Sequence, residues 1–187
     1  MRPIALYVRS RGVPAALLAL PVVVLLVWSA MHSPWMPLSA SLTSLAAVLV
    51  ITVGLAGQDP ELDRSTAVPW PVWRFGHLLL AAVLAAVSVL LVQELGHETF
   101  EVEFMLRDAA GMVGLAGLAA TVAGARSAPA AAVMWWAVSA MVPPGESVLS
   151  RIARWPMCPA DDAVAMWTAG VLFVVGVTAY AARGGRR

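Results

Sequence analysis

The stretch AAGMVGLAGLAATVAG, residues 109–124, is apolar throughout and carries its smallest residues at helical spacing. These small residues recur three or four positions apart, at Ala110, Gly114, Gly117, Thr121 and Gly124. Residues at this spacing share one face of an α-helix, and small side chains there allow a neighbouring helix to approach closely. The stretch therefore predicts a membrane-embedded helix that packs through its small face, either within this chain or against another subunit.

The composition of the whole chain extends this prediction. Of 187 residues, 60% are hydrophobic and 12% are charged, whereas soluble domains average roughly 45–50% and about 25%. This excess of apolar residues comes in blocks, which is typical of a membrane protein. The net charge of +1 gives no footprint for a nucleic-acid partner. A single cysteine, Cys158, excludes an internal disulfide and a cysteine-rich metal site.

Six apolar blocks predict an all-α, polytopic membrane protein with one transmembrane domain over residues 1–187. The blocks cover approximately residues 13–31, 37–57, 75–95, 109–125, 128–143 and 162–182. About 20 helical residues cross roughly 30 Å of hydrocarbon, and the fourth and fifth blocks are shorter than this. Only ARSA divides these two, which predicts a tight helical hairpin, or alternatively one re-entrant pair. The first block is interpreted as a retained span, with a cleavable signal as the alternative.

The distribution of the arginines predicts the orientation of the six spans. With six crossings, both termini lie on one side of the membrane, and that side holds nine of the twelve basic residues. They are Arg2, Arg9, Arg11, Arg64, Arg74, Arg126, Arg183, Arg186 and Arg187. The positive-inside rule makes this side cytoplasmic. We therefore expect a multi-pass protein of the cytoplasmic (cell) membrane with both termini inside, and with Arg107, Arg151 and Arg154 outside.

Charged residues are absent from the middle third of every predicted span. Charges at that depth usually mark ion pathways or proton relays, so their absence argues against an ion-coupled transporter. The three histidines fall at span ends, which argues against a haem held between spans. No His/Asp/Ser constellation can be named, so we expect no enzymatic activity from this chain.

The longest polar stretch, GQDPELDRSTAVPWPVWRFGH at 57–77, joins the second and third spans. Asp59 is a good N-cap, Pro60 fits the first helical position and Glu61 favours the positive end of the helix dipole. These residues predict a helix of about two turns on the cytoplasmic face, ending before VPWPVW. It is interpreted either as a docking helix for a cytoplasmic partner or as an ordinary turn with good caps.

The end of the same loop is expected to brace this short helix. Pro69 and Pro71 predict an extended chain, because proline disfavours helix in the residue before it. Trp70 and Trp73 are expected to anchor the segment at the inner membrane surface, and Arg74 to begin the third span. On the other side of the membrane, ESVLSRIARW predicts a short interfacial helix with Ser147 as its N-cap.

These pieces together resemble the six-span permease subunits of ATP-binding-cassette transporters, of the exporter-like kind with a separate ATPase. The segments that carry the resemblance are RPIALYVRSRGVP, DPELDRSTAVPWPVWR and ESVLSRIARW. In that family they correspond to a basic elbow before the first span, a coupling helix between spans two and three, and short outer helices between spans five and six. The N-terminal segment LYVRSRGVPAALLAL and the loop segment ELDRSTAVPWPVWR also look like those of small permeases encoded by actinobacteria.

The resemblance implies a membrane subunit that pairs with a second permease subunit and with cytoplasmic ATPase subunits. The residues implied in ATPase docking are Asp59, Glu61, Leu62, Asp63 and Arg64, braced by Trp70, Trp73 and Arg74. The chain has no GxxxxGK[ST] phosphate loop, so it would carry no cofactor, and ATP–Mg²⁺ would lie on the partner.

Two other functions compete with the exporter. A non-transporting accessory or scaffold subunit of a larger membrane complex fits the small-residue stripe equally well. A copper-handling protein is the third hypothesis, because the chain has thioether and thiol side chains and such soft ligands select Cu(I). Its candidate ligands are Met31, His32 and Met36, then His97 and Met105, then Met157 and Cys158. No paired metal-ligand motif lies within a span, and gap-filling methionines are common in apolar interfaces, so no metal site is assigned.

Overall fold

The structure is a computed structural model, which describes residues 13–30, 37–52, 55, 70–96 and 101–185. In this part of the chain the regular elements are all helical, which confirms the all-α fold class. They are α2 (Val13–Ala30), α3 (Pro37–Thr52), α5 (Trp70–Gly96), α6 (Val102–Val122), the 3-10 helix η2 (Ala125–Ser127), α7 (Ala128–Met141), α8 (Val148–Ala153), the 3-10 helix η3 (Trp155–Met157) and α9 (Ala163–Arg183).

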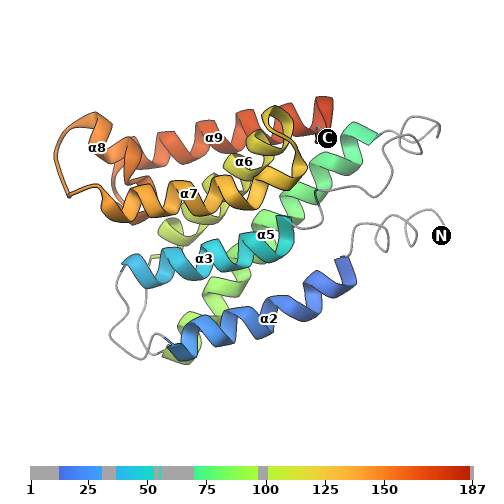
Figure 1. Cartoon of the computed structure of the whole chain (residues 1–187). Helices are drawn as coiled ribbons and strands as arrows, with labels where there is room; N and C mark the ends of the chain where they lie inside the picture. The colour runs from blue at the N-terminus through green and yellow to red at the C-terminus, as the bar shows by residue number, and fades with distance from the viewer. Residues whose placement is uncertain (1–12, 31–36, 53–54, 56–69, 97–100, 186–187) are drawn as a thin grey trace.

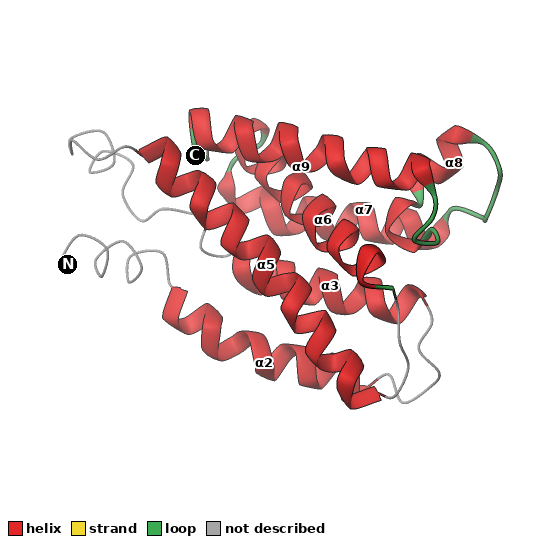
Figure 2. Ribbon diagram, turned by 180° about the vertical axis from the view of Figure 1, so that it is seen from behind, coloured by secondary structure: helices red, strands yellow, loops and turns green. Residues whose placement is uncertain are grey.

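The long helices run back and forth between two ends of one bundle (Figure 1). We call one the Arg74 end: there α2 and α5 begin, η2 turns the chain, and α9 finishes. We call the other the Trp155 end: it holds the starts of α3, α6 and α9 together with α8 and η3. From behind, α5 crosses the bundle obliquely, between α2 and α6 (Figure 2).

Three of these helices are long and apolar enough to cross a membrane: α6, α9 and the Trp70–Leu91 part of α5. The chain is therefore a helical membrane protein. The helices α2, α3 and α7 contain 18, 16 and 14 residues. At 1.5 Å per residue they are about 27, 24 and 21 Å long, which is less than the roughly 30 Å of a typical hydrocarbon core.

The core of the bundle forms around α6. This helix packs most extensively on α9 and also contacts α3, α5 and α7. Alanine, glycine and methionine dominate its buried positions, and such small or adaptable side chains let several neighbours approach one helix. By contrast, α2, α5, α7 and α9 each expose a row of large apolar side chains, such as Leu18, Val83, Met134 and Trp167. This exposed apolar surface suits contact with lipid chains.

Two helices begin earlier in the sequence than the spans predicted for them. The third span was expected at 75–95 after an extended Pro69–Pro71 segment, but α5 is already helical at Trp70. Pro71 is compatible with this start, because the first turn of a helix needs no backbone N–H from that residue. The fourth span was expected at 109–125, but α6 begins at Val102. Arg107 and Asp108 are therefore part of the helix and not of an outer loop.

The other boundaries follow local signals that the sequence displays. A turn at ARSA joins α6 to α7, as expected for a helical hairpin, and Gly124 adopts φ 105° there. Because α6 has 21 residues, it is long enough to cross the membrane without forming half of a re-entrant pair. The Ser147 side chain accepts a hydrogen bond from the backbone N–H of Ser150 and caps α8, as predicted. Asp162 caps α9 in the same way.

Candidate functional site

Glycines bring α6 and α9 into backbone contact at the middle of the bundle. A Cβ placed on Gly176 of α9 would collide with the carbonyl oxygen of Gly114 on α6. A Cβ on Gly114 would collide in turn with the backbone of α9 at Leu172 and Phe173. A Cβ on Gly117 would lie 3.1 Å from the Gly176 oxygen. Only glycine permits this approach, so the pair α6–α9 forms a closely packed unit.

The small residues predicted to form one face of α6 lie in different surroundings. Gly114, Gly117 and Thr121 are buried, and the two glycines pack within the chain and not against another subunit. Ala110 is half-buried. Gly124 lies beyond the last residue of α6, where its positive φ serves the turn and not the helix face. The complementary glycine, Gly176, was not among the predicted residues.

A charged pair lies inside the bundle at the Trp155 end. Arg107 and Asp108 have fully buried side chains, and Nη2 of Arg107 lies 3.2 Å from Oδ1 of Asp108. The same guanidinium group donates to the carbonyl oxygens of Pro159 at 2.6 Å and Cys158 at 2.8 Å. Its carbon also lies 4.8 Å from the centroid of the Phe104 ring, within the range of a cation–π contact. This pair ties α6 to the segment that leads into α9.

The hydrogen bonds do not satisfy the pair completely. Among the described residues, Nε of Arg107 and Oδ2 of Asp108 are buried without a hydrogen-bond partner. Buried charges in membrane helices are costly and usually functional. The sequence contained a partial signal for this pair: Arg107 precedes Gly111 by four residues and Gly114 by seven, so it shares their helical face. The prediction missed it because adjacent arginine and aspartate were taken to mark a loop.

Another buried side chain at this end of the bundle is that of a tryptophan. Trp155 is the last residue of the segment ESVLSRIARW, which was predicted to be interfacial, but it is fully buried. A Cβ on Gly111 would collide with its ring, so the absence of a side chain at Gly111 makes the space that Trp155 fills. The Ser139 hydroxyl lies 2.8 Å from the Trp135 oxygen and 2.7 Å from the Ala153 oxygen. Through Ser139, α7 is connected to the C-terminal residue of α8.

A groove of about 300 Å³ opens between α6 and α9 at the Trp155 end. The residues that line it are Glu103, Leu106, Arg107, Met166, Ala169 and Gly170. The walls are mainly apolar, and Glu103 is exposed. No atom lies within 4 Å of the position that a Cβ of Gly170 would occupy. This volume is near the lower limit of small-molecule sites in proteins, so the groove has room for one small ligand or one alkyl chain.

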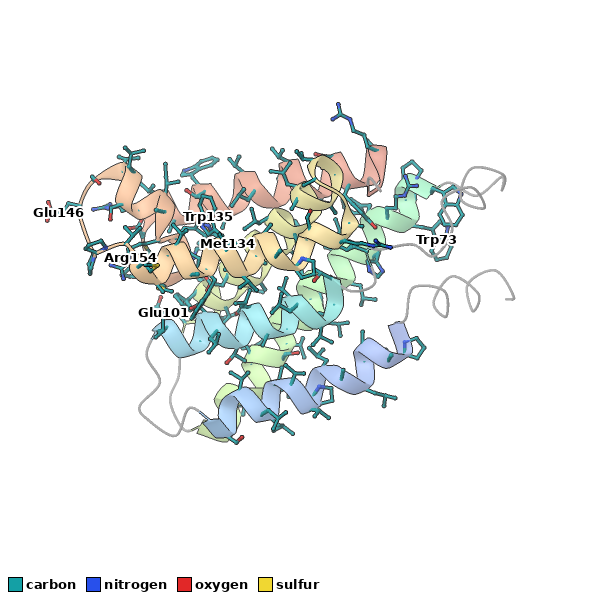
Figure 3. All side chains as sticks on the ribbon, in the orientation of Figure 1. Trp73, Glu101, Met134, Trp135, Glu146 and Arg154 are labelled. Atoms are coloured by element: carbon teal, nitrogen blue, oxygen red, sulfur yellow. The ribbon has the colours of Figure 1, made fainter. Side chains whose placement is uncertain are left out.

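The Arg74 end is held together by different contacts. Arg74 lies near the start of α5, and Gly184 directly follows the last residue of α9. A Cβ placed on Gly184 would lie 2.8 Å from the guanidinium carbon of Arg74. The Tyr180 hydroxyl donates to the Leu55 carbonyl oxygen at 3.1 Å and links α9 to the residues after α3. Trp73, whose side chain is half-buried, lies at the start of α5, whereas Glu101, Glu146 and Arg154 lie at the opposite end of the bundle (Figure 3).

The residues predicted to dock an ATPase are Asp59, Glu61, Leu62, Asp63 and Arg64, and they lie outside the described residues. Their expected braces Trp70, Trp73 and Arg74 are within the first turns of α5 and are half-buried. The structure therefore describes the helix that directly follows the docking sequence, and not the sequence itself.

The candidate copper ligands are only partly described. Met31, His32, Met36 and His97 lie outside the described residues. Met105 is fully buried in an apolar cluster with Ala40, Val89 and Phe104, so it fills a core position. The part of the chain that the structure describes contains no group of three or more His, Cys, Asp and Glu side chains that could hold a metal ion.

Cys158 lies in the connection between η3 and α9. Burial of the thiol, followed by the nearby carboxylate of Asp162, raises the pKa of Cys158 above its ordinary value. The Cys158 sulfur lies 3.9 Å from the carbonyl oxygen of Arg151. A thiol with a raised pKa is a poor nucleophile and a poor metal ligand at neutral pH, because both roles need the thiolate.

Comparison with known proteins gives no family for this chain. No family model, curated protein or solved structure matches it significantly.

Proposed function

We propose that this chain is the membrane-spanning permease subunit of an ATP-driven exporter of the ATP-binding-cassette kind. In this proposal all six long helices cross the cytoplasmic membrane, and the Arg74 end faces the cytoplasm. Arg74, Arg126 and Arg183 lie at that end, which agrees with the positive-inside rule. The shorter α2, α3 and α7 would be accommodated by local thinning of the bilayer, at a modest cost per ångström of mismatch.

The contact between Arg74 and Gly184 is the observation that carries the proposal. The docking sequence at 59–64 ends a few residues before α5 begins at Trp70, and Arg74 lies near the start of that helix. Because Arg74 packs on the residue that ends α9, a force on the docking segment would act on α5 and α9 together. The glycine contact with α6 would then carry the movement towards the Trp155 end.

This route gives each partner a role. The ATPase would bind ATP–Mg²⁺, since this chain has no phosphate loop, and would dock on Asp59, Glu61, Leu62, Asp63 and Arg64. A second permease subunit, identical or different, would complete the pathway across the lipid bilayer. Within this chain the α6–α9 unit would move as a rigid body, because its helices touch through their backbones.

Purification in mild detergent tests the proposal. We expect a cytoplasmic ATPase with a phosphate loop to co-purify with the full chain, and the double variant Leu62→Ala/Asp63→Ala to lose it. The matched control is Glu146→Ala, which alters an exposed residue at the Trp155 end and should retain the ATPase. If no ATPase co-purifies, or if the double variant retains it as well as the control does, the proposal is wrong.

An accessory or scaffold subunit is the second candidate, and the direction of the polar side chains favours it. The described polar residues of α3, namely Ser41, Thr43, Ser44 and Thr52, are buried inside the bundle. Large apolar side chains are exposed along the described helices, and the exposed charged residues of the long helices, Glu94, Glu103 and Arg183, lie near helix ends. The described helices therefore present no charged wall to a pathway. For a scaffold we expect co-purification of other membrane subunits without an ATPase, so the same experiment separates the two functions.

A further inference from the structure

The groove between α6 and α9 has the length and the apolar walls to hold an alkyl chain. Glu103 lies in the first turn of α6, whereas Gly170 is seven residues into α9, about 10 Å from the start of that helix. Between these points the apolar walls are Leu106, Met166 and Ala169. The missing side chain at the exposed residue Gly170 leaves this end of the groove open, because nothing lies within 4 Å of its Cβ position.

The groove is lined by one exposed carboxylate, that of Glu103. Arg107 also lines it, but the guanidinium group is paired with Asp108 and donates to two carbonyl oxygens. Glu103 is exposed at the start of α6, and none of the described residues forms an ion pair with it. A carboxylate beside hydrocarbon interacts favourably with a cation that lies close to it.

We propose that this groove binds a single-chain amphiphile that has one positive charge in its head group. The alkyl chain lies along Leu106, Met166 and Ala169 and ends near Gly170, and the cationic head group contacts the Glu103 carboxylate. A phospholipid fits less well, because its phosphate would bring a second negative charge to Glu103. Binding in this groove needs no ATPase partner, so the purified chain alone is sufficient for the test.

Two substitutions separate the space of the groove from its charge. Gly170→Leu fills the groove without displacing any atom, since the Cβ position is open. Its matched control is Gly76→Leu, because Gly76 lies in α5 at the other end and its Cβ position is equally open. Glu103→Gln removes the charge and keeps the shape. The control for this change is Glu101→Gln, an exposed neighbour that does not line the groove.

The experiment measures binding of tritiated dodecyltrimethylammonium to the full chain in phosphatidylcholine nanodiscs, with protein-free nanodiscs subtracted. We expect saturable binding that unlabelled dodecyltrimethylammonium displaces and that dodecyl sulfate and dodecyl maltoside displace poorly. Gly170→Leu should abolish saturable binding, whereas Gly76→Leu should leave it unchanged. Glu103→Gln should weaken binding about threefold, the size expected for a partly exposed ion pair, and Glu101→Gln should have no effect.

Equal binding by Gly170→Leu and Gly76→Leu would overturn the proposal, and so would equal displacement by the cationic, anionic and neutral dodecyl compounds. A phospholipid that mass spectrometry finds retained on the purified chain, and that the cationic probe does not displace, would also overturn it. If Gly170→Leu fails to fold, Glu103→Gln decides the matter, because binding identical to that of Glu101→Gln contradicts the assigned head-group contact.

Discussion

The two ends of the bundle are held together by different kinds of contact. At the Trp155 end, a buried ion pair and a buried tryptophan connect α6 with the segment before α9. At the Arg74 end, the described cross-links include one hydrogen bond from Tyr180 and the packing of Arg74 on Gly184. The desolvated charges make the first end sensitive to a change in either partner. The two contacts described at the second end are individually weak, which suits a region that moves with a partner.

The largest effect is expected from breaking the ion pair at the Trp155 end. Arg107→Met leaves Asp108 buried without a counter-charge, and removal of one partner from a buried pair typically costs about 3–5 kcal/mol. The free energy of unfolding, measured by titrating micelles of the purified protein with sodium dodecyl sulfate, should fall by this amount. The double variant Arg107→Met/Asp108→Leu should recover most of the loss. A double variant as unstable as Arg107→Met would contradict the proposed cost of the unpaired carboxylate.

A smaller but still large effect is expected at the glycine contact that joins the two ends. Gly176→Ala places a methyl group against the Gly114 carbonyl oxygen, and overpacking of this kind costs about 1–3 kcal/mol. Gly170→Ala is the matched control in the same helix, where the added methyl meets nothing. It should leave the free energy of unfolding unchanged or raise it by about 0.5–1 kcal/mol. Equal stability of the two variants would refute the close approach of α6 and α9.

At the Arg74 end we expect a modest loss of stability. Tyr180→Phe removes the hydrogen bond to Leu55 and keeps the ring, so the free energy of unfolding should fall by about 0.5–1.5 kcal/mol. The same micelle titration measures this loss. A loss as large as that of Arg107→Met would remove the difference between the ends.

The smallest predicted effect concerns Cys158, whose thiol pKa is raised by burial and by Asp162. Less thiolate is then present at pH 7–9 than for an ordinary thiol, so alkylation by iodoacetamide should be slow there and increase with pH to above pH 9. Asp162→Asn keeps a good N-cap for α9 and removes the charge, so it should lower the thiol pKa and speed alkylation. An unchanged pH profile in this variant would show that Asp162 does not contribute.

The sequence alone predicted the helices well, because apolar blocks and caps are local signals. The predicted span at 162–182 agrees with α9 within one residue, since Asp162 is a strong N-cap. The start of α6 was missed because Arg107 and Asp108 interrupt the apolar pattern, and only their contacts with Pro159 and Cys158 explain why a helix tolerates them. Such contacts between distant residues have no local signature.

The candidate sites show the same difference between local sequence signals and contacts made by distant residues. The glycines of α6 were found because their spacing is visible in one segment, whereas Gly176 and Trp155 act through partners on other helices. The groove at Gly170 forms only when α6 and α9 are side by side. The docking residues 59–64 remain a prediction from the sequence.

Cysteine labelling of intact cells tests the central claim, that the two ends lie on opposite sides of the membrane with the Arg74 end inside. In a chain whose own thiol is removed by Cys158→Ser, two single variants place a thiol at exposed positions: Glu146→Cys at the Trp155 end and Arg126→Cys at the Arg74 end. A membrane-impermeant maleimide should label Glu146→Cys in intact cells and Arg126→Cys only after permeabilisation. Labelling of Arg126→Cys in intact cells, or labelling of both from the same side, would contradict the account.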